Sequence, residues 1–573
     1  FGRAIQTQGA DGVVSTISRQ WCIECEPGSL WVEHTQPQGQ PSTKTYADKW
    51  GRIVAKAQQG FDGAWVTVSM TYDEQGRPVA ETLPNSTLAT YTSYDVLGRV
   101  IQIENPQGNT SSVYIGGNYT RSTNAKGQRS DEYTNGFGET TRTVDHLGGE
   151  VAFRYDASGN LIETTVTARG GQLDSTLILY DNWGNKIAMD DPVKGVWSYT
   201  YNAFGELIEQ TSAHGQTQAI MYDSLGRKVR SYQPNVGTRC WYYGNSSAAH
   251  NRGRVVRSAL HRNVSVDCDA SRTPEHEQQF SYDSAGRLSQ QLTMIEGTPY
   301  VESYSYDNDG RLATTTYPSG TAPVSVRREY NSYGYFTALV RVETNSVLKT
   351  IEATNDQGLV TSISYQGGQQ ATRTYNSLGW LTYTSMRNSG NDLNAVSLTH
   401  DALGNVTSRL SEFERVLGAS THIQESYTYD GLNRLRRTQQ SFTDVNGTLT
   451  TTQNTTNEQR YDGFGNITFR TGVGNYTYAT DGSMRLMQVT PSLDDGDEDV
   501  IIIDPPPGCC GTIPMSLTPM VPPISGSSRF YNFSYDASGN VLNDGLRTFT
   551  YDGADRVTHI SSNGSSSSMR YDA

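Results

Sequence analysis

The sequence predicts an all-β protein, built of repetitive antiparallel β-hairpins that follow one another along one long sheet. A short motif that begins with Tyr-Asp and closes with Gly recurs along the chain, which indicates an array of similar structural units. No long stretch carries apolar residues at the i, i+3, i+4, i+7 spacing of a helix. The hydrophobic fraction, 35% of 573 residues, is too low to fill one large core, so we expect a sheet with both faces partly wetted.

The clearest copy of the motif is Tyr222-Asp-Ser-Leu-Gly-Arg227. Tyr is common in strands, Asp opens a tight turn by accepting backbone N–H groups, and Gly takes the positive φ that a Cβ disfavours. Each copy is therefore predicted to form a hairpin corner, most simply a type I turn closed by a Gly bulge. Close copies begin at Tyr72, Tyr94, Tyr155, Tyr282, Tyr306, Tyr461 and Tyr535.

Degenerate copies fill the intervals, and they begin at Tyr180, Tyr201, Tyr375, His400, Tyr429 and Tyr551. Successive starts differ by 22 residues from Tyr72 to Tyr94 and by 21 from Tyr201 to Tyr222. At about 5–6 residues per strand plus two turns, one such period holds two strands. Two periods would also supply a propeller blade of roughly 40–45 residues. A β-propeller is therefore the alternative architecture, although spacings from 16 to 32 residues disfavour it.

With these motifs the chain resembles the YD-repeat family, which includes bacterial Rhs proteins, the B and C components of insecticidal Tc toxins and, more distantly, the animal teneurins. The matching runs extend from Phe1-Gly-Arg3 to Tyr571-Asp572. The resemblance implies a sheet that spirals into a hollow shell, which in the bacterial members encloses a toxic C-terminal domain. If about 60% of the residues lie in strands, a closed shell would have an inner radius of about 16 Å, barely enough for a domain of ~100 residues.

Changes in the repeat divide the chain into regions. Residues 1–70 carry degenerate repeats and are a candidate capping region, and regular arrays are expected at 72–232 and 282–481. Residues 233–280 are predicted to be an irregular, loop-rich insertion. An acidic and Pro-rich insertion follows at 491–525, where the carboxylates could hold Ca²⁺ or the Ile and Pro residues could line an opening of the shell. Residues 530–573 carry further repeats and end within one, as expected for a piece of a longer protein.

Charge and cysteine content exclude several classes of protein. A net charge of −14 argues against a nucleic-acid binder, and no apolar segment approaches the ~18 residues of a membrane span. Six cysteines are too few for a disulfide scaffold of this size. Cys22-Ile-Glu-Cys25 has the spacing of half a zinc site, but no second pair completes it, so we expect free thiols or a local disulfide. Cys240 and Cys268 flank an irregular stretch and are candidates to bridge its base.

No catalytic constellation emerges from the sequence. The many Asp residues open turns, the nine His are scattered, and Glu275-His276-Glu277 lacks the His-x-x-x-His spacing of a zinc protease. No Gly-x-Ser-x-Gly elbow or phosphate-binding Gly-Lys-Ser/Thr loop occurs. We therefore expect no enzymatic activity, and no catalytic, cofactor-binding or metal-binding residues.

The repeat and the resemblance together favour a non-enzymatic shell segment of a secreted bacterial polymorphic toxin of the Rhs type, acting in bacterial competition. The partners implied are a C-terminal toxin domain beyond this chain, enclosed as cargo, and a delivery apparatus such as a type VI spike or a Tc translocation subunit. Neither nucleic acid nor a membrane span is expected. The alternative is a cell-surface adhesion or carbohydrate-binding YD-repeat protein, for which rows of Tyr and Asn would be suitable platforms.

Overall fold

The computed structural model describes residues 5–9, 12–22, 25–168, 173–262, 264–268, 273–318, 322–388, 391–414, 420–446, 449–481, 483–491, 531–562 and 564–571. Within these ranges the regular secondary structure consists of strands. Apart from Pro491, the insertion expected at 491–525 lies outside the described residues. The described part of the chain contains no helix long and apolar enough to cross a membrane.

Strands β1–β42 form one sheet, in which each strand pairs antiparallel with the next along the chain, and β43–β47 continue as a five-stranded sheet. The first 25 strands are β1 Gln6–Gln8, β2 Val14–Trp21, β3 Trp31–Pro37, β4 Thr43–Ala47, β5 Ile53–Gln59, β6 Trp65–Tyr72, β7 Pro78–Thr82, β8 Ala89–Tyr94, β9 Val100–Glu104, β10 Thr110–Gly116, β11 Tyr119–Thr123, β12 Arg129–Thr134, β13 Thr140–Val144, β14 Glu150–Tyr155, β15 Leu161–Thr167, β16 Leu173–Tyr180, β17 Lys186–Asp191, β18 Gly195–Tyr201, β19 Leu207–Thr211, β20 Thr217–Tyr222, β21 Lys228–Gln233, β22 Gly237–Tyr243, β23 Val255–Arg262, β24 His276–Tyr282 and β25 Leu288–Ile295. The others are β26 Thr298–Tyr306, β27 Leu312–Tyr317, β28 Val324–Tyr330, β29 Phe336–Arg341, β30 Ser346–Thr354, β31 Val360–Tyr365, β32 Gln369–Tyr375, β33 Leu381–Asn388, β34 Asn391–His400, β35 Val406–Glu414, β36 Ser420–Tyr429, β37 Leu435–Asn446, β38 Leu449–Tyr461, β39 Ile467–Arg470, β40 Gly474–Tyr478, β41 Leu486–Thr490, β42 Tyr531–Asn532, β43 Ser534–Tyr535, β44 Val541–Asn543, β45 Thr548–Tyr551, β46 Val557–Ser562 and β47 Ser565–Ser568.

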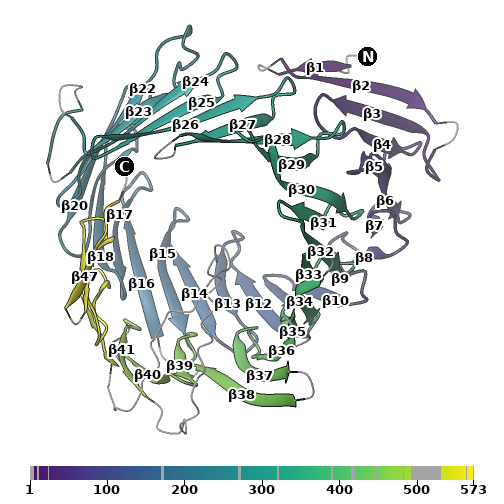
Figure 1. Ribbon diagram of the computed structural model, residues 1–573. Coiled ribbons are helices and arrows are strands. Elements are labelled where there is room, and N and C mark those ends of the chain that lie inside the picture. Colours follow the sequence, from purple (N-terminus) through teal and green to yellow (C-terminus); the bar gives the residue numbers. More distant parts are fainter. Residues whose placement is uncertain are drawn as a thin grey trace.

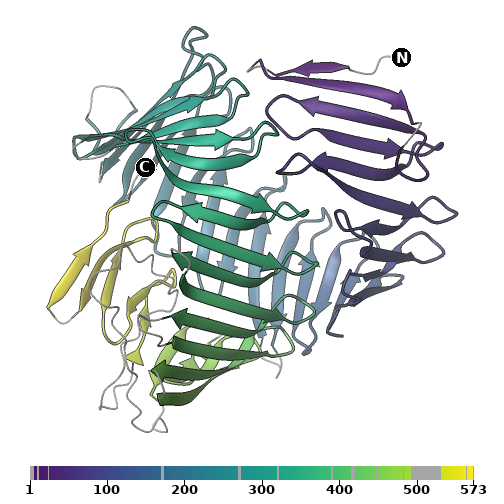
Figure 2. The same ribbon diagram turned by 45° about the vertical axis from the view of Figure 1, so that its right-hand side comes forward.

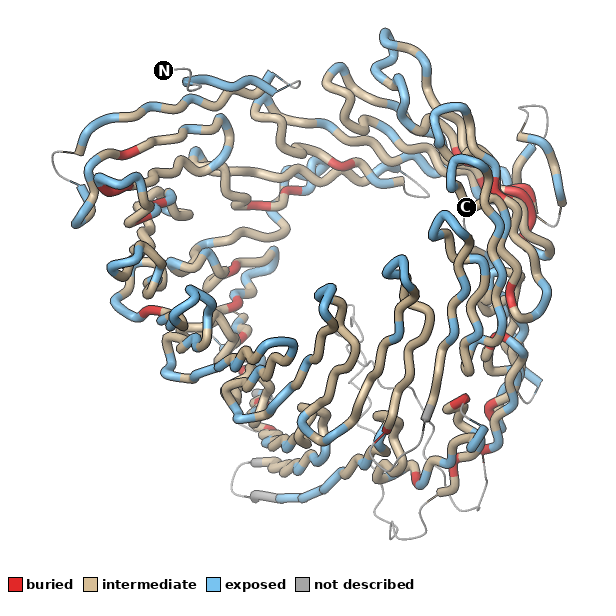
Figure 3. The backbone as a smooth tube through the Cα atoms, turned by 180° about the vertical axis from the view of Figure 1, so that it is seen from behind, coloured by how far each residue is buried: buried red, intermediate tan, exposed pale blue. Residues whose placement is uncertain are grey.

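The ribbon of strands winds as a spiral around an open centre (Figure 1). The protein exposes 34284 Å², whereas a compact monomer of 63.0 kDa would expose about 20,000 Å². Figure 3 shows the buried positions scattered along the ribbon instead of gathered in one core. The prediction of an all-β spiral of hairpins that forms a hollow shell is confirmed, and a sheet of 42 strands that pair in chain order leaves no need for propeller blades.

The hairpin corner has the predicted geometry. In the turn after β20, Asp223 Oδ1 accepts the backbone N–H groups of Leu225 at 2.9 Å and Arg227 at 3.0 Å. The N–H of Gly226 donates to the Asp223 carbonyl at 3.0 Å, Gly226 has a φ of 74°, and the register of the sheet shifts at Tyr222. Arg227 Nε also donates to Asp223 Oδ2 at 2.7 Å, and this bond lowers the pKa of the Asp223 carboxyl.

The Tyr and Arg of the motif couple each repeat to its neighbours. The Tyr222 hydroxyl donates to the carbonyl of Leu207, the first residue of β19 in the preceding repeat, at 3.0 Å. The Arg227 guanidinium lies 4.2 Å from the ring centroid of Tyr243, the corresponding tyrosine of the next hairpin. The same bond from hydroxyl to carbonyl is made by Tyr72, Tyr94, Tyr155, Tyr243, Tyr282, Tyr306, Tyr330, Tyr375, Tyr429, Tyr461, Tyr478, Tyr535, Tyr551 and Tyr571.

Antiparallel pairing of consecutive strands places alternate connections at opposite edges of the ribbon. As far as β41, the Tyr-Asp turns all follow even-numbered strands and therefore form one edge, which we call the tyrosine edge. After the break between β42 and β43, the turns that follow Tyr535 and Tyr551 continue this edge. The connections that follow odd-numbered strands, such as those after β3, β5 and β17, form the opposite edge.

Two disulfides lie within the described residues. Cys22 is bonded to Cys25 and Cys240 to Cys268, each with a Cα–Cα distance of 5.5 Å. The first pair is therefore a local disulfide and not half of a zinc site, and the second bridges the region that the sequence marked as irregular. In that region, 233–280, the structure places β22, β23 and most of β24, and the described residues between them are 244–254, 264–268 and 273–275. The division into regions stays a prediction.

Candidate functional site: the seam between successive coils

The later half of the ribbon docks on the earlier half. Hydrogen bonds join residues that lie between 270 and 324 positions apart in the sequence, so one revolution of the spiral takes about that many residues. We call residues 5–296 the first coil and 298–571 the second coil. In these hydrogen bonds the tyrosine edge of the second coil meets the opposite edge of the first, and we call this line of contact the seam (Figure 2).

Near its start, the seam is made by the turn after β28. Asn331 Nδ2 donates to the Phe61 carbonyl at 2.7 Å, and the Tyr335 hydroxyl donates to the Gln59 carbonyl at 2.7 Å. Between them, Tyr333 lies against Gly63, which has a φ of 85°, and a Cβ at Gly63 would overlap the tyrosine ring. Glycine is therefore required here both for the turn and for the close approach of the second coil.

Further along, a lysine of the first coil binds two turns of the second. Lys126 Nζ lies 2.9 Å from Asp401 Oδ2 and 3.1 Å from Asn433 Oδ1. Burial alone would raise the pKa of Asp401, but hydrogen bonds from Asn405 and Lys126 outweigh it and lower the pKa to about 2. Asp401 therefore stays ionised near neutral pH and holds the ammonium group across the seam.

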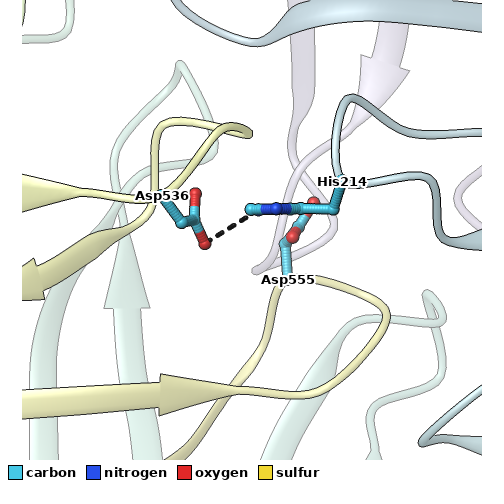
Figure 4. Close-up of side chains that lie close together, drawn as sticks. All are labelled: His214, Asp536 and Asp555. Carbon is cyan, nitrogen blue, oxygen red and sulfur yellow. Dashed lines mark ion pairs between the residues drawn. The ribbon is translucent and has the colours of Figure 1, made fainter.

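Three side chains converge near the end of the second coil (Figure 4). His214 Nε2, in the turn after β19, lies 3.1 Å from Asp536 Oδ2 and 3.2 Å from the backbone nitrogen of Ser538. Asp555 completes the cluster, and Asn540 Nδ2 donates to both carboxylates, at 2.9 Å to Asp536 Oδ2 and 2.8 Å to Asp555 Oδ1. An imidazole and two carboxylates are ligands that a zinc ion can use. The hydrogen bonds from Asn540 hold the two carboxylates together, and the cluster joins three turns from the two coils.

Among the described residues, His214, Asp536 and Asp555 are the only group of three such side chains with ligand atoms close enough to share a metal, within 4.8 Å of one another. From the sequence we expected no metal-binding residues, and no motif pointed to His214 or Asp555. One signal was available: Asp555 stands where the repeat calls for Gly and has a φ of 58°. Asn433, with a φ of 61°, replaces the same Gly and also acts across the seam, accepting from Gln128 Nε2 at 3.3 Å.

Comparison with known proteins identifies the repeat. The RHS Repeat family model matches residues 72–110. The chain is 25% identical over 293 residues to the double-stranded DNA deaminase toxin A of Burkholderia cenocepacia (strain H111), an alignment that covers 50% of this chain and 18% of that protein.

Solved structures agree in fold. The crystal structure of TcdB2-TccC3-Cdc42 matches 94% of this chain and 30% of its own chain, with a TM-score of 0.68 and 14% identity. TcdB2-TccC3-TEV gives a TM-score of 0.64 at 14% identity, over 96% of this chain and 29% of its own. A Photorhabdus luminescens Tc holotoxin pore gives 0.58 at 14% identity, over 93% and 32%. The chain carries an Rhs repeat at residues 72–110 and shares the fold of these Tc structures. It spans less than a third of the length of each of these relatives.

A cleft of about 810 Å³ opens on the seam of this Rhs-repeat protein. The first coil contributes Asp145 and Leu147, and the second coil contributes the residues around Asp430, Arg434 and Asp462. Arg434 Nε donates to Asp430 Oδ2 at 2.7 Å, as in the other Tyr-Asp turns, so the first residue of the basic stretch Arg434-Leu-Arg436-Arg437 is paired within its own turn. The lining includes no Ser, Cys or His that could serve as a nucleophile or general base.

The Asp carboxylates of the repeat turns form hydrogen bonds within their own turns. Asp73, Asp95 and Asp307 each accept a side-chain bond from the Arg four residues on, at 2.6, 2.7 and 2.8 Å. In Glu275-His276-Glu277, His276 is buried and Glu277 pairs with Arg257 at 2.7 Å. These contacts account for the carboxylates as parts of turns and of the sheet, as the sequence analysis expected. The seam between the two coils is therefore the candidate functional site.

Proposed function

We propose that this chain is a non-enzymatic wall segment of a secreted bacterial polymorphic toxin of the Rhs type, which encloses an effector domain lying beyond the chain. The observation that supports this most directly is the seam. Hydrogen bonds such as Asn331 to Phe61 and Lys126 to Asp401 close the line between successive coils around the open centre. A container needs such a seal because gaps would admit protease, whereas a flat adhesion surface gains nothing from it.

The comparisons support the toxin context of the proposal. One relative is by its name a toxin, and one of the matched structures is by its title a Tc holotoxin pore, so the fold occurs in toxin proteins. Cargo identity is not carried over from the relatives. Secretion, and delivery by a type VI spike or a Tc translocation subunit, form part of the proposal together with the enclosed C-terminal toxin domain.

Protease protection tests the proposal in a parent protein that carries the effector. The effector should survive protease while the shell is intact, and the double variant Asn331→Asp, Tyr335→Phe should speed its digestion by about tenfold or more, because proteolysis follows the open population. Asn376→Asp is the matched control, because the described hydrogen bonds of its turn stay within the second coil, and it should leave the rate unchanged.

Two results would contradict the proposal. One is digestion of the effector in the intact parent as fast as digestion of the free effector. The other is catalytic turnover by purified residues 1–573 that a single Asp or His substitution abolishes without unfolding the chain. Specific glycan binding by the chain, with no protection of an effector, would favour the adhesion alternative.

A further inference from the structure

The chain contains the hexapeptide Tyr-Asp-Ala-Ser-Gly-Asn twice, at 155–160 and at 535–540. The first copy forms an ordinary hairpin corner of the first coil. Asp156 Oδ1 accepts the Ser158 N–H at 2.8 Å, Asp156 Oδ2 accepts the Asn160 side-chain amide at 2.9 Å, and Ser158 is exposed. This copy shows which hydrogen bonds the six residues make when they form a corner alone.

The second copy lies on the seam, and its polar groups reach beyond their own turn. Asn540 Nδ2 donates to Asp536 Oδ2 at 2.9 Å, as in the first copy, and also to Asp555 Oδ1 at 2.8 Å. The backbone nitrogen of Ser538 lies 3.2 Å from His214 Nε2 of the first coil. Ser538 is only 8% exposed, and its hydroxyl has no hydrogen-bond partner among the described residues. The same hexapeptide therefore joins a polar cluster where the first coil supplies a histidine.

Hydrogen bonds alone do not satisfy both neighbours of the His214 ring. Its Nε2 lies 3.1 Å from Asp536 Oδ2, a carboxylate oxygen that accepts, and 3.2 Å from the Ser538 N–H, which donates. One ring nitrogen either carries a proton or offers a lone pair, so it can serve one of these neighbours and not the other. A metal ion removes this conflict, because Nε2 and the carboxylate oxygen would both bind the cation through lone pairs. The Ser538 N–H would then be free to donate to Asp536 Oδ1, as the Ser158 N–H does to Asp156.

We propose that His214, Asp536 and Asp555 form a zinc site that fastens the second coil to the first (Figure 4). Their ligand atoms lie within 4.8 Å of one another, and all three residues are half-buried, so an ion can reach them from solvent. Zinc holds nitrogen and oxygen ligands at about 2.0–2.2 Å in a tetrahedron, whose edges are then about 3.3–3.6 Å long. The 3.1 Å between His214 Nε2 and Asp536 Oδ2 needs little adjustment to fit such an edge.

The surroundings of the three ligands suit a divalent cation. Asn540 holds two carboxylates together, and a cation would neutralise their mutual repulsion while the amide keeps them oriented. The imidazole favours zinc over calcium and magnesium, which prefer oxygen ligands. Three protein ligands leave a fourth position for water, and such a water is the kind of partner that the buried Ser538 hydroxyl lacks. The ion would join the sheet β43–β47 to the turn after β19, and this inference does not depend on the shell holding cargo.

Calorimetric titration of the full chain with zinc chloride tests the site. Every arm carries Cys509→Ser and Cys510→Ser, so that the remaining cysteines are those of the two disulfides. Asp555→Gly removes one ligand and restores the glycine of the repeat at a φ of 58°, so this variant should fold at least as well as the parent. It should bind zinc at least about 100-fold more weakly, because groups that only support a ligand already contribute about 10–100-fold. His214→Gln should weaken zinc binding to a similar extent.

Two matched controls make the result specific to the cluster. Asp156→Asn changes the same carboxylate in the first copy of the hexapeptide. His422→Gln removes an imidazole that lies 3.2 Å from the carboxylate of Glu412 and belongs to no group of three such ligands among the described residues. Both control variants should bind zinc as tightly as the parent.

Hydrogen exchange measured by mass spectrometry shows whether the ion joins the two coils. Zinc should slow exchange in the peptides that contain Gly215 and Gly539, whose N–H groups close the turns of His214 and Asp536, and Asp555→Gly should abolish this protection. The proposal would be overturned by a parent chain that binds no zinc, or by zinc that all variants bind equally, which would mark it as an adventitious ion only. Zinc that binds without slowing exchange in both peptides would also overturn it.

Discussion

Replacing Asn331 by Asp changes the seam while leaving the hairpin corner intact. Asn331 Oδ1 accepts the N–H groups of Tyr333 and Tyr335 at 3.0 Å each, and Nδ2 donates to the Phe61 carbonyl at 2.7 Å. Aspartate occupies the same position in most repeats and makes the same two turn bonds, for example at Asp223. The substitution therefore removes only the donor that reaches the first coil and sets a carboxylate oxygen against a carbonyl oxygen.

The free-energy cost of Asn331→Asp can be estimated from this geometry. Losing one hydrogen bond costs about 0.5–1.5 kcal/mol, and leaving the Phe61 carbonyl without a donor and next to a negative charge adds about 1 kcal/mol or more. We expect the local opening of the seam to become easier by about 2 kcal/mol, which corresponds to about a thirtyfold increase in the open population. The global melting temperature should change little, because the antiparallel ladder of β28 and β29 is untouched.

Hydrogen exchange measured by mass spectrometry reads this opening directly. The peptide that contains Gly60 and Gly63, whose N–H groups close the turn after β5, should exchange faster in Asn331→Asp. Asn376→Asp is the matched control, since Asn376 Oδ1 makes the same two turn bonds, to Leu378 and Trp380 at 3.0 Å each. Equal acceleration by both substitutions, or by neither, would refute the reasoning that the Asn331 amide holds the coils together.

Three further outcomes test the repeat itself. Gly226→Val places a β-branched residue at a φ of 74° and should lower the free energy of unfolding by about 1–3 kcal/mol, as measured by denaturant melts. The same change at the exposed Ser224 should lower it little, and an equal loss of stability in both variants would contradict the turn assignment. Burial, and then the nearby Asp462 carboxylate, raises the pKa of Tyr478 to about 12. The hydrogen bond from the Tyr478 hydroxyl to the Ile467 carbonyl should therefore stabilise the fold fully below about pH 10 and be lost as the pH rises towards 12. A melting temperature that does not change across this pH range would contradict this role of the bond. Reducing the Cys240–Cys268 disulfide, which spans 28 residues, should lower the free energy of unfolding by roughly 3–4 kcal/mol, as measured by calorimetry. If a Cys240→Ala, Cys268→Ala variant has the same melting temperature as the oxidised protein, the disulfide contributes nothing to stability.

Departures from the repeat carry functional information. Asn433 and Asp555 each replace the turn glycine at a positive φ, which costs more for a residue with a Cβ than for Gly. Asn433 binds Lys126 and Gln128 across the seam, and Asp555 lies beside His214. A scan of the sequence for repeats that lose this glycine would have selected both positions, and such a scan is the signal that could have located the seam from sequence.

The sequence by itself determined the strands, the corners and their order. Asp223, Gly226 and Arg227 interact within five consecutive residues, so their turn could be deduced from residue types and spacing. The period of about 22 residues then predicted two strands per repeat and one long antiparallel sheet. The sequence did not show that the Tyr222 hydroxyl binds the preceding repeat, because that bond depends on the twist between adjacent hairpins.

Only the tertiary structure decided which turns meet across the seam. The partners Asn331 and Phe61, or His214 and Asp536, are brought together by the accumulated twist and bend of a dozen or so intervening hairpins, and a small change per hairpin would shift the contact to another turn. Tyr333 and Phe137 follow the same local rule and precede a turn glycine in the same way, yet one is covered and the other is 93% exposed. The difference lies in whether a coil lies beneath the turn, which no residue within the turn encodes.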